Sequence, residues 1–272
     1  MYKLLISLLT VTCSWSHADL ESYVNSHLPL VGSNVRRIHW QGQHYWIKVA
    51  DPRKGWTSCW GRKLSSVIVP DKIIAPTDVC QNEILETEAR RLRECEQRQG
   101  ACARLILATK HYIVVSDAGI SFETFIQNLP LEQRLAYLEK GLQAILDLHK
   151  HYLVQGRASI KDLTINENKA ISFIDLAEDP EASMGFEEAR TRDLIAYFMT
   201  SVKVLEGDEK LQNQYADLFN DSIPLELRPL FTRLMRKTAW LSTIAHFIED
   251  WGGKDIKSFA TAHRLLKPYF LN

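Results

Sequence analysis

The secondary-structure signals along the chain change character near residue 117. Upstream of this point the pattern predicts a hairpin that turns at Gln41–Gln43, then a helix rich in Glu, Arg and Leu, and then a second hairpin. The expected strands are 35–40, 44–49, 103–109 and 112–115, and the expected helix is 81–97. This β-β-α-β-β order predicts a small β-rich lobe.

Downstream, the apolar residues follow helical spacing. Residues 121–129 predict a short helix, and Pro130 begins a long amphipathic helix with an apolar stripe on one face. Further elements are expected as strands at 163–165 and 170–174 and as helices at 187–204, 208–219, 226–249 and 254–268. We therefore predict an α+β, bilobal chain with a small β-rich N-lobe, a hinge and a larger helical C-lobe.

Composition excludes several classes of protein. With 46% hydrophobic and 24% charged residues, the 272-residue chain is neither disordered nor fibrous. Lysine plus arginine equals aspartate plus glutamate, 33 against 33, so no general attraction to nucleic acid is expected. No apolar run reaches the roughly 18 residues of a membrane span, which excludes a multi-span membrane protein.

Residues 1–18 have the pattern of a secretory signal peptide. A basic start at Lys3 is followed by an apolar run at 4–11, and small residues Ser16 and Ala18 precede the expected cleavage point. The alternative is a short hydrophobic helix or strand that packs on the body. The expected division is thus 1–18 as leader or hydrophobic segment, 19–117 as N-lobe and 118–272 as C-lobe.

Without the leader, four cysteines remain: Cys59, Cys80, Cys95 and Cys102. An even number is compatible with two disulfides in an oxidising compartment. The spacing contains no Cys-x-x-Cys pair, so a zinc ribbon or a thioredoxin-like site is not expected. Between disulfides and unpaired buried thiols, we favour unpaired thiols in a chain of this size.

Four short stretches carry the functional signal: Tyr45–Lys48, Val114–Gly119, Leu148–Asp162 and Phe173–Ala177. Together they resemble the protein-kinase-like superfamily, and the chain looks most similar to bacterial small-molecule and lipopolysaccharide kinases of the Kdo-kinase type. The resemblance covers about residues 35–205. It implies a bilobal protein-kinase-like fold that uses ATP and Mg²⁺.

The resemblance assigns nucleotide-binding roles to residues of the N-lobe and hinge. Lys48 corresponds to the lysine that reaches the α- and β-phosphates of ATP and is held by a carboxylate on the next helix. Glu88 is the best match for that carboxylate because Leu92 lies one turn later, and Glu86 is the alternative. Backbone groups of Ser116 and Ala118 would bind adenine at the hinge.

The resemblance also assigns the metal site and the catalytic loop. Asp175 follows a β-rich run, as the family's magnesium-binding Asp does. Asp162 and Arg157 stand at the spacings from Asp175 where the family has its metal-binding Asn and its base Asp. Carboxylate oxygens suit Mg²⁺, so Asp162 and Asp175 are the expected ligands. A second interpretation makes Asp162 the base and Glu167 a ligand.

Three positions depart from the family pattern. Arg157 cannot accept a hydroxyl proton, although it can stabilise a transferring phosphate or bind an anionic group of a substrate. Gly32 is the only glycine between residues 19 and 40, which is too few for the usual phosphate cradle. Gln155 stands where the family has histidine. Asp193, by contrast, resembles the buried Asp that accepts hydrogen bonds from the catalytic loop.

Basic residues interleave with Trp56 and Trp60 at 53–63, a stretch without an acidic residue. Such a composition is typical of peripheral contact with a bilayer or a phosphorylated glycolipid, and the alternative is a solvated loop that covers the N-lobe. Arg228, Arg233, Arg236 and Lys237 lie on a later helix, where a solvated face explains them.

These observations predict an ATP- and Mg²⁺-dependent phosphotransferase whose acceptor is a small molecule or a lipopolysaccharide sugar. Protein acceptors are less favoured because residues 176–190 lack an evident activation segment. The alternatives are a catalytically inactive pseudokinase that acts as a binding or regulatory module, and an envelope lipid- or glycan-binding protein. The leader predicts export to the periplasm, whereas a kinase on lipid precursors is expected at the cytoplasmic face of the inner membrane.

Overall fold

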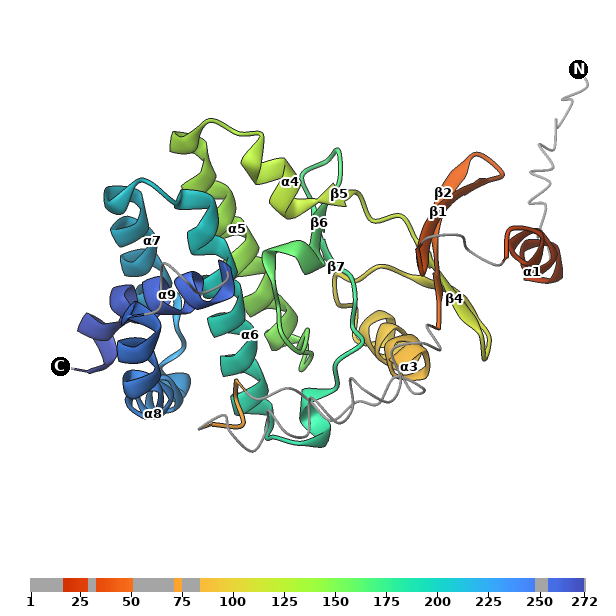
Figure 1. The fold of residues 1–272 in the computed structure, drawn as a ribbon. Coiled ribbons are helices and arrows are strands. Elements are labelled where there is room, and N and C mark those ends of the chain that lie inside the picture. The colour runs from red at the N-terminus through yellow and green to blue at the C-terminus, as the bar shows by residue number, and fades with distance from the viewer. Residues whose placement is uncertain (1–16, 29–32, 51–70, 75–83, 248–253, 272) are drawn as a thin grey trace, which may run out of the picture.

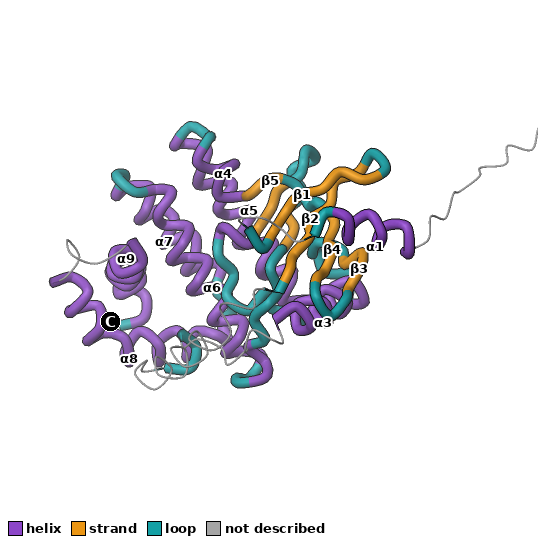
Figure 2. Tube along the Cα trace, turned by 45° about the vertical axis from the view of Figure 1, so that its right-hand side comes forward, coloured by secondary structure: helices purple, strands orange, loops and turns teal. Residues whose placement is uncertain are grey.

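The computed structural model describes residues 17–28, 33–50, 71–74, 84–247 and 254–271, which form two lobes (Figure 1). The strands gather at one end and helices fill the other (Figure 2). The predicted α+β class, with a small β-rich N-lobe and a larger helical C-lobe, is confirmed. Among the described residues, no helix is long and apolar enough to cross a membrane.

The N-lobe is a four-stranded antiparallel sheet in the order β1-β2-β4-β3. The strands are β1 (Val35–Trp40), β2 (Gln43–Val49), β3 (Leu105–Ala108) and β4 (Tyr112–Ser116), and the helices are α1 (His17–Ser26) and α3 (Ile84–Gln97). Side chains alternate between the two faces of β4, so that Ile113 and Val115 join the main core while Tyr112 and Val114 face α1.

The C-lobe begins with a small three-stranded sheet, ordered β5-β6-β7, and continues in helices. Its elements are β5 (Ile120–Ser121), α4 (Phe122–Gln127), α5 (Leu131–Lys150), β6 (Leu163–Ile165), β7 (Ile171–Phe173), α6 (Phe186–Ser201), α7 (Glu209–Ser222), α8 (Arg228–Phe247) and α9 (Lys254–Phe270). Short 3₁₀ turns stand at Ile160–Asp162, Pro180–Ala182, Val202–Leu205 and Leu225–Leu227. The expected helix at 187–204 thus ends in a tighter turn, and β5 was not expected.

One hydrophobic core runs through both lobes. Leu92 of α3 and Ile113 of β4 pack in the same cluster as Leu148 of α5 and Phe198 of α6. Helices α5 and α6 approach closely at Gly141, where a Cβ would stand 2.0 Å from the Tyr197 hydroxyl. The shared core places the ends of β4, β6 and β7 along a single seam between the lobes.

Several sequence predictions lie outside the described residues. These are residues 1–16 of the expected leader, Gly32, the loop with Trp56 and Trp60, the cysteines Cys59 and Cys80, the start of the expected helix at 81–83 and the end of the expected helix at 248–249. They stay predictions.

Candidate functional site

Lys48 of β2 is the centre of an ion-pair cluster that joins three elements. Its Nζ lies 2.5 Å from Oε1 of Glu88 on α3 and 3.1 Å from Oδ1 of Asp175, which follows β7. Glu88 is buried, whereas the Asp175 side chain is 54% exposed and open to solvent. Of the two carboxylates considered for Lys48, it is therefore Glu88 and not Glu86 that contacts it.

Burial and charge act against each other at this pair. For Glu88, burial raises the carboxyl pKa, and the Lys48 ammonium partly offsets this effect. For Lys48, burial alone lowers the ammonium pKa, but the charges of Glu88 and Asp175 outweigh it and leave the pKa raised. Lys48 is thus held as a cation at the seam, which suits a group that contacts phosphates.

The loop at residues 155–158, which was predicted to be catalytic, is held by Asp193 of α6. The fully buried carboxylate accepts hydrogen bonds from the amides of Gln155 (2.6 Å), Gly156 (2.8 Å) and Ala158 (3.2 Å), and lies 3.3 Å from His149 Nε2. This confirms the structural role predicted for Asp193. Because three amides point at one carboxylate, the loop conformation is closely determined.

Gln155 connects this loop to the segment that carries Asp175. Its buried side-chain amide donates to the carbonyl of Asp175 (3.1 Å), and its Oε1 accepts from the Arg157 amide (2.9 Å). Asp175 itself has φ +60°, a left-handed backbone that aspartate tolerates better than most residues and that recurs at functional sites. The Gln155 side chain thereby bridges the 155–157 loop and the segment that carries Asp175.

Asp162 lies beside Asp175 at the end of a 3₁₀ turn. Burial and then the negative charge of Asp175 raise the pKa of Asp162 to about 7, although Arg157 and Lys48 act in the opposite direction. Its Oδ2 accepts from the Ser159 amide at 3.3 Å, and its backbone carbonyl accepts from the Ile174 amide at 2.9 Å. The two carboxylates predicted as metal ligands are therefore neighbours on one seam.

This pair fits a magnesium ion. The donors are hard carboxylate oxygens whose mutual repulsion a cation would relieve. Among the described residues, no cluster of three or more His, Cys, Asp or Glu side chains suits a metal. Since Mg²⁺ is commonly bound by one or two carboxylates together with phosphates and water, Asp162 and Asp175 would hold it and the nucleotide would complete the shell. The ion would neutralise phosphate charge during transfer.

Arg157 is an exposed cation whose charge acts on the Asp162 carboxylate. Its side chain is 65% exposed, and Nε lies 3.4 Å from Oε1 of Glu178. Arg157 follows Gly156, where φ is +115° and a Cβ would stand 3.0 Å from the Glu178 carbonyl oxygen. A backbone conformation that only glycine adopts freely therefore sets the direction in which the chain continues to Arg157.

Ser116 is the last residue of β4, and Ala118 lies in the segment that connects β4 to β5. Within the described part of the chain, the amide of Ala118 makes no hydrogen bond, whereas the Asp117 amide donates to the His44 carbonyl at 3.2 Å. The Ser116 amide already has a partner, since it donates to the carbonyl of Arg104, the residue before β3. The Ala118 carbonyl accepts from Thr164 Oγ1 at 3.2 Å. Of the two residues predicted to bind adenine, Ala118 is thus the one whose backbone amide has no partner among the described residues.

Sequence reasoning missed two arginines that assemble the site. Arg91 of α3 is buried and donates to the backbone carbonyls of Val154, Gln155 and Glu178, which ties α3 to the loop that carries Arg157. Arg192 of α6 donates to the Gly156 carbonyl at 2.6 Å and pairs with Glu178 Oε2 at 2.8 Å. Arg192 stands directly before Asp193, but its helical spacing gives no signal that distinguishes it from a solvated arginine.

Cys95 and Cys102 form a disulfide, with Cα atoms 6.2 Å apart. The preference for unpaired thiols was wrong for these two residues. Cys95 lies in the last turn of α3 and Cys102 precedes β3, and their separation of 7 residues allows a tight loop to bring them together. The carbonyl of the neighbouring Ala101 accepts a hydrogen bond from the Phe173 amide at 2.8 Å, so the loop closed by the disulfide also contacts β7.

Comparison with known proteins adds three findings. No protein-family model matches the chain. A Haemophilus influenzae protein described as uncharacterized is 22% identical over 163 residues, which cover 59% of this chain and 60% of that protein. The Cydia pomonella granulovirus kinase PK-1 aligns over 80% of this chain and 84% of its own, with 11% identity and a TM-score of 0.37. The chain therefore spans about 60% of the length of the curated relative it matches.

Proposed function

We propose that the chain is an ATP- and Mg²⁺-dependent phosphotransferase of the kinase type. The observation that carries the proposal is Lys48, held between buried Glu88 and exposed Asp175 where the two lobes meet. An ion pair of this kind and a metal-binding Asp must both be in place for phosphoryl transfer in kinases. Lys48 would bind the α- and β-phosphates, and Asp162 with Asp175 would hold the metal.

The acceptor we propose is a small molecule or a lipopolysaccharide sugar, as in Kdo-type kinases, that carries an anionic group. Support comes from Arg157, a largely exposed cation beside the metal carboxylates. A guanidinium binds phosphate or carboxylate oxygens in a two-pronged manner and stays charged at any pH of interest. Arg157 would orient the acceptor or stabilise the transferring phosphoryl group.

Phosphoryl transfer makes modest demands on a base, because charge stabilisation and positioning provide most of the catalysis. This is why Arg157 at the base position is compatible with slow turnover. Asp162 is the remaining carboxylate that could take the proton. If Asp162 is a metal ligand, Asp162→Asn should weaken MgATP binding; if it is the base, the variant should bind MgATP normally and lose turnover.

A catalytically inactive pseudokinase is the second candidate, and the Arg157–Glu178 contact favours it. In that case the same site would bind nucleotide, or a related anion, without transferring phosphate. Turnover distinguishes the two candidates. A phosphotransferase and a pseudokinase can both bind MgATP, but only the phosphotransferase consumes it in the presence of an acceptor.

The first test is thermal unfolding of the full chain with and without ATP and Mg²⁺. A ligand at 100 times its dissociation constant stabilises the native state by about 2.7 kcal/mol. We expect a stabilisation that needs the metal and is lost in Asp175→Ala and Lys48→Met. Asp147→Ala, an exposed carboxylate on α5, is the matched control and should keep it. Absence of any shift at millimolar ATP in the unaltered chain would refute the proposal.

A further inference from the structure

Residues 71–74 are a short segment of the connection between β2 and α3, and they lie against the C-lobe. In Figure 1 they form the short orange stretch beside the lower end of α6, on the far side of the molecule from β1 and β2. The chain therefore leaves the N-lobe sheet after Val49, contacts the C-lobe, and returns to the N-lobe at Ile84. We call residues 71–74 the clasp.

The clasp has an apolar anchor. Ile73 is fully buried in the core shared by the two lobes, and Ile74 packs against the same core. Ile74 also lines a small cavity with Ile195 of α6 and Leu234 of α8. Burial of an isoleucine is worth about 2 to 3 kcal/mol, enough to hold a short segment in place.

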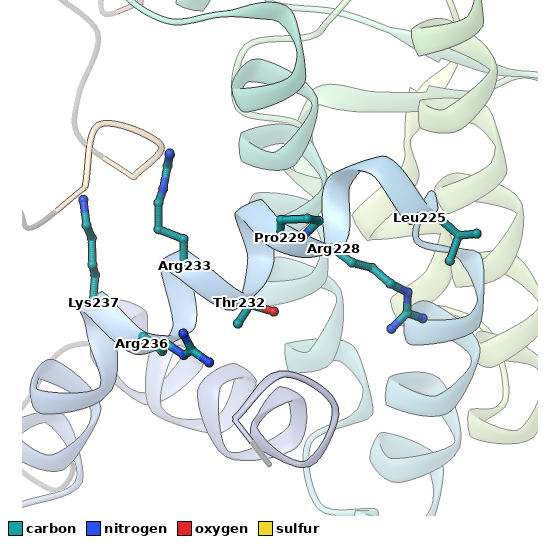
Figure 3. Close-up of a pocket in the computed structure, with 7 residues that line it drawn as sticks. All are labelled: Leu225, Arg228, Pro229, Thr232, Arg233, Arg236 and Lys237. Carbon is teal, nitrogen blue, oxygen red and sulfur yellow. The ribbon is translucent and has the colours of Figure 1, made fainter.

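The clasp also has an ionic anchor on α8 and α6. The buried Asp71 carboxylate lies 3.3 Å from Nε of Arg233 and 3.2 Å from Nζ of Lys237, and Lys72 Nζ lies 2.5 Å from Oε2 of Glu188. Figure 3 shows Arg233 and Lys237 pointing to the same side of α8, and Arg236 pointing elsewhere. The sequence predicted that all four cations of α8 lie on a solvated face. Two of them, Arg233 and Lys237, instead bind the buried Asp71 carboxylate.

Arg192 connects the clasp to the candidate active site. One guanidinium donates to the Ile73 carbonyl at 2.8 Å, to the Gly156 carbonyl at 2.6 Å and to Glu178 Oε2 at 2.8 Å. Glu178 in turn contacts Arg157 through its other oxygen. The buried Arg192 side chain is thus hydrogen-bonded both to the clasp and to the loop that carries Arg157.

We propose that the clasp is a conformational switch that governs the nucleotide site. In the docked state, Asp71–Ile74 ties the β2–α3 connection to the C-lobe, and Arg192 holds Gly156 and Glu178 in place. In the undocked state the ion pairs of Asp71 and Lys72 are broken, Arg192 loses one of its partners, and the catalytic loop gains freedom. Docking therefore favours the assembled site, and ionic strength or a competing anion on α8 shifts the equilibrium.

The test compares neighbouring cations on α8. Lys237→Gln removes a partner of Asp71, whereas Arg236→Gln is the matched control, because Arg236 is exposed and forms no ion pair among the described residues. Asp71→Asn removes the buried charge and keeps an oxygen for the Ile73 amide. Hydrogen exchange of the full chain without nucleotide is followed at residues 73–74 and 156–158, at low salt and at high salt.

We expect Lys237→Gln and Asp71→Asn to speed exchange at both places about fivefold at low salt, the equivalent of about 1 kcal/mol, with Arg236→Gln unchanged. High salt should speed exchange in the unaltered chain towards the level of the variants. Faster exchange at 73–74 without any change at 156–158 would show that the clasp is not coupled to the loop, and would overturn the inference.

A second arm measures the dissociation constant of MgATP, since the role in nucleotide binding rests on the proposed function. We expect about fivefold weaker binding in Lys237→Gln and Asp71→Asn and no change in Arg236→Gln. Equal affinity in all four proteins would overturn control of the site by the clasp. An unaltered chain that binds no MgATP would overturn the proposed function and this control with it, whereas the coupling is decided by hydrogen exchange alone.

Discussion

At the scale of single residues, the carboxylates of Asp193 and Asp162 show how the surroundings of an acidic group decide its behaviour. Asp193 accepts three backbone amides and lies beside His149, so its negative charge is met by fixed donors. Asp162 accepts from one amide and lies beside a second carboxylate, so its charge is poorly compensated. The first therefore holds the loop, and the second is ready to release its proton to a cation.

The raised pKa of Asp162 predicts a pH dependence of stability without metal. With a pKa of about 7 in the folded chain against 3.8 unfolded, the folded state keeps a proton that the unfolded state has lost between these values. Stability should therefore fall as pH rises from 5 to 7.5. In chelator, urea unfolding should show the chain losing about 2 kcal/mol relative to Asp162→Asn over this range. Parallel curves for the two proteins would contradict the pKa.

At the scale of elements, α1 completes the N-lobe. Leu20 and Val24 are buried against Ile38, Ile47 and Val114 on the sheet face opposite α3. The Tyr23 hydroxyl donates to the His39 carbonyl at 2.9 Å and fixes the helix along β1. A four-stranded sheet with one uncovered apolar face would be marginal, so α1 provides the second layer of the lobe.

The packing of α1 predicts that substitutions at the neighbouring residues Val24 and Asn25 change the free energy of unfolding by different amounts. Val24→Ala removes two buried methyl groups and should lower the free energy of unfolding by about 2 kcal/mol. Asn25→Ala changes an exposed side chain one position later and should stay within about 0.5 kcal/mol. Urea unfolding of both variants checks this. Equal stability of Val24→Ala and the unaltered chain would mean that α1 does not pack on the sheet.

At the scale of the whole molecule, α3 joins the lobes from both of its sides. Glu88 binds Lys48 of the sheet. On its other side α3 contacts the C-lobe: Arg90 pairs with Asp179, Arg91 donates to the Gln155 carbonyl, and Arg98 donates to the Tyr152 carbonyl. The disulfide at Cys95 then ties the end of α3 to the loop that pairs with β7. The assembled Lys48–Glu88 pair is therefore a property of the contacts between lobes.

The disulfide predicts a loss of stability for the chain as a whole. Opening a short loop releases conformational entropy in the unfolded state, so Cys95→Ala with Cys102→Ala should lower the free energy of unfolding by about 2.5 kcal/mol. A digest under non-reducing conditions should give one linked peptide pair from Cys95 and Cys102 by mass spectrometry. Alkylation of both thiols in denatured, unreduced protein would contradict the bridge.

Most elements were predictable from the sequence because their signals are local. Hairpin turns, the proline before α5 and helical periodicity placed β1 to β4 and α3 to α9 within a few residues. Residues of the candidate site were predictable only through spacing and resemblance, which pointed to Lys48, Glu88, Asp162 and Asp175. The structure places these four side chains on one seam. The short strand β5 was missed because two residues carry no periodic pattern.

The sequence by itself determined the two-lobed α+β order, since strand and helix periods are properties of neighbouring residues. Only the tertiary structure decided the partners of Arg91, Arg192 and Asp71, the covering of the sheet by α1, and the pairing of Cys95 with Cys102. These interactions join residues far apart in the chain or depend on loop geometry. The local sequence around a charged or thiol side chain is the same whether that side chain is solvated or bonded to a distant partner. Only its burial in the folded chain distinguishes the two cases.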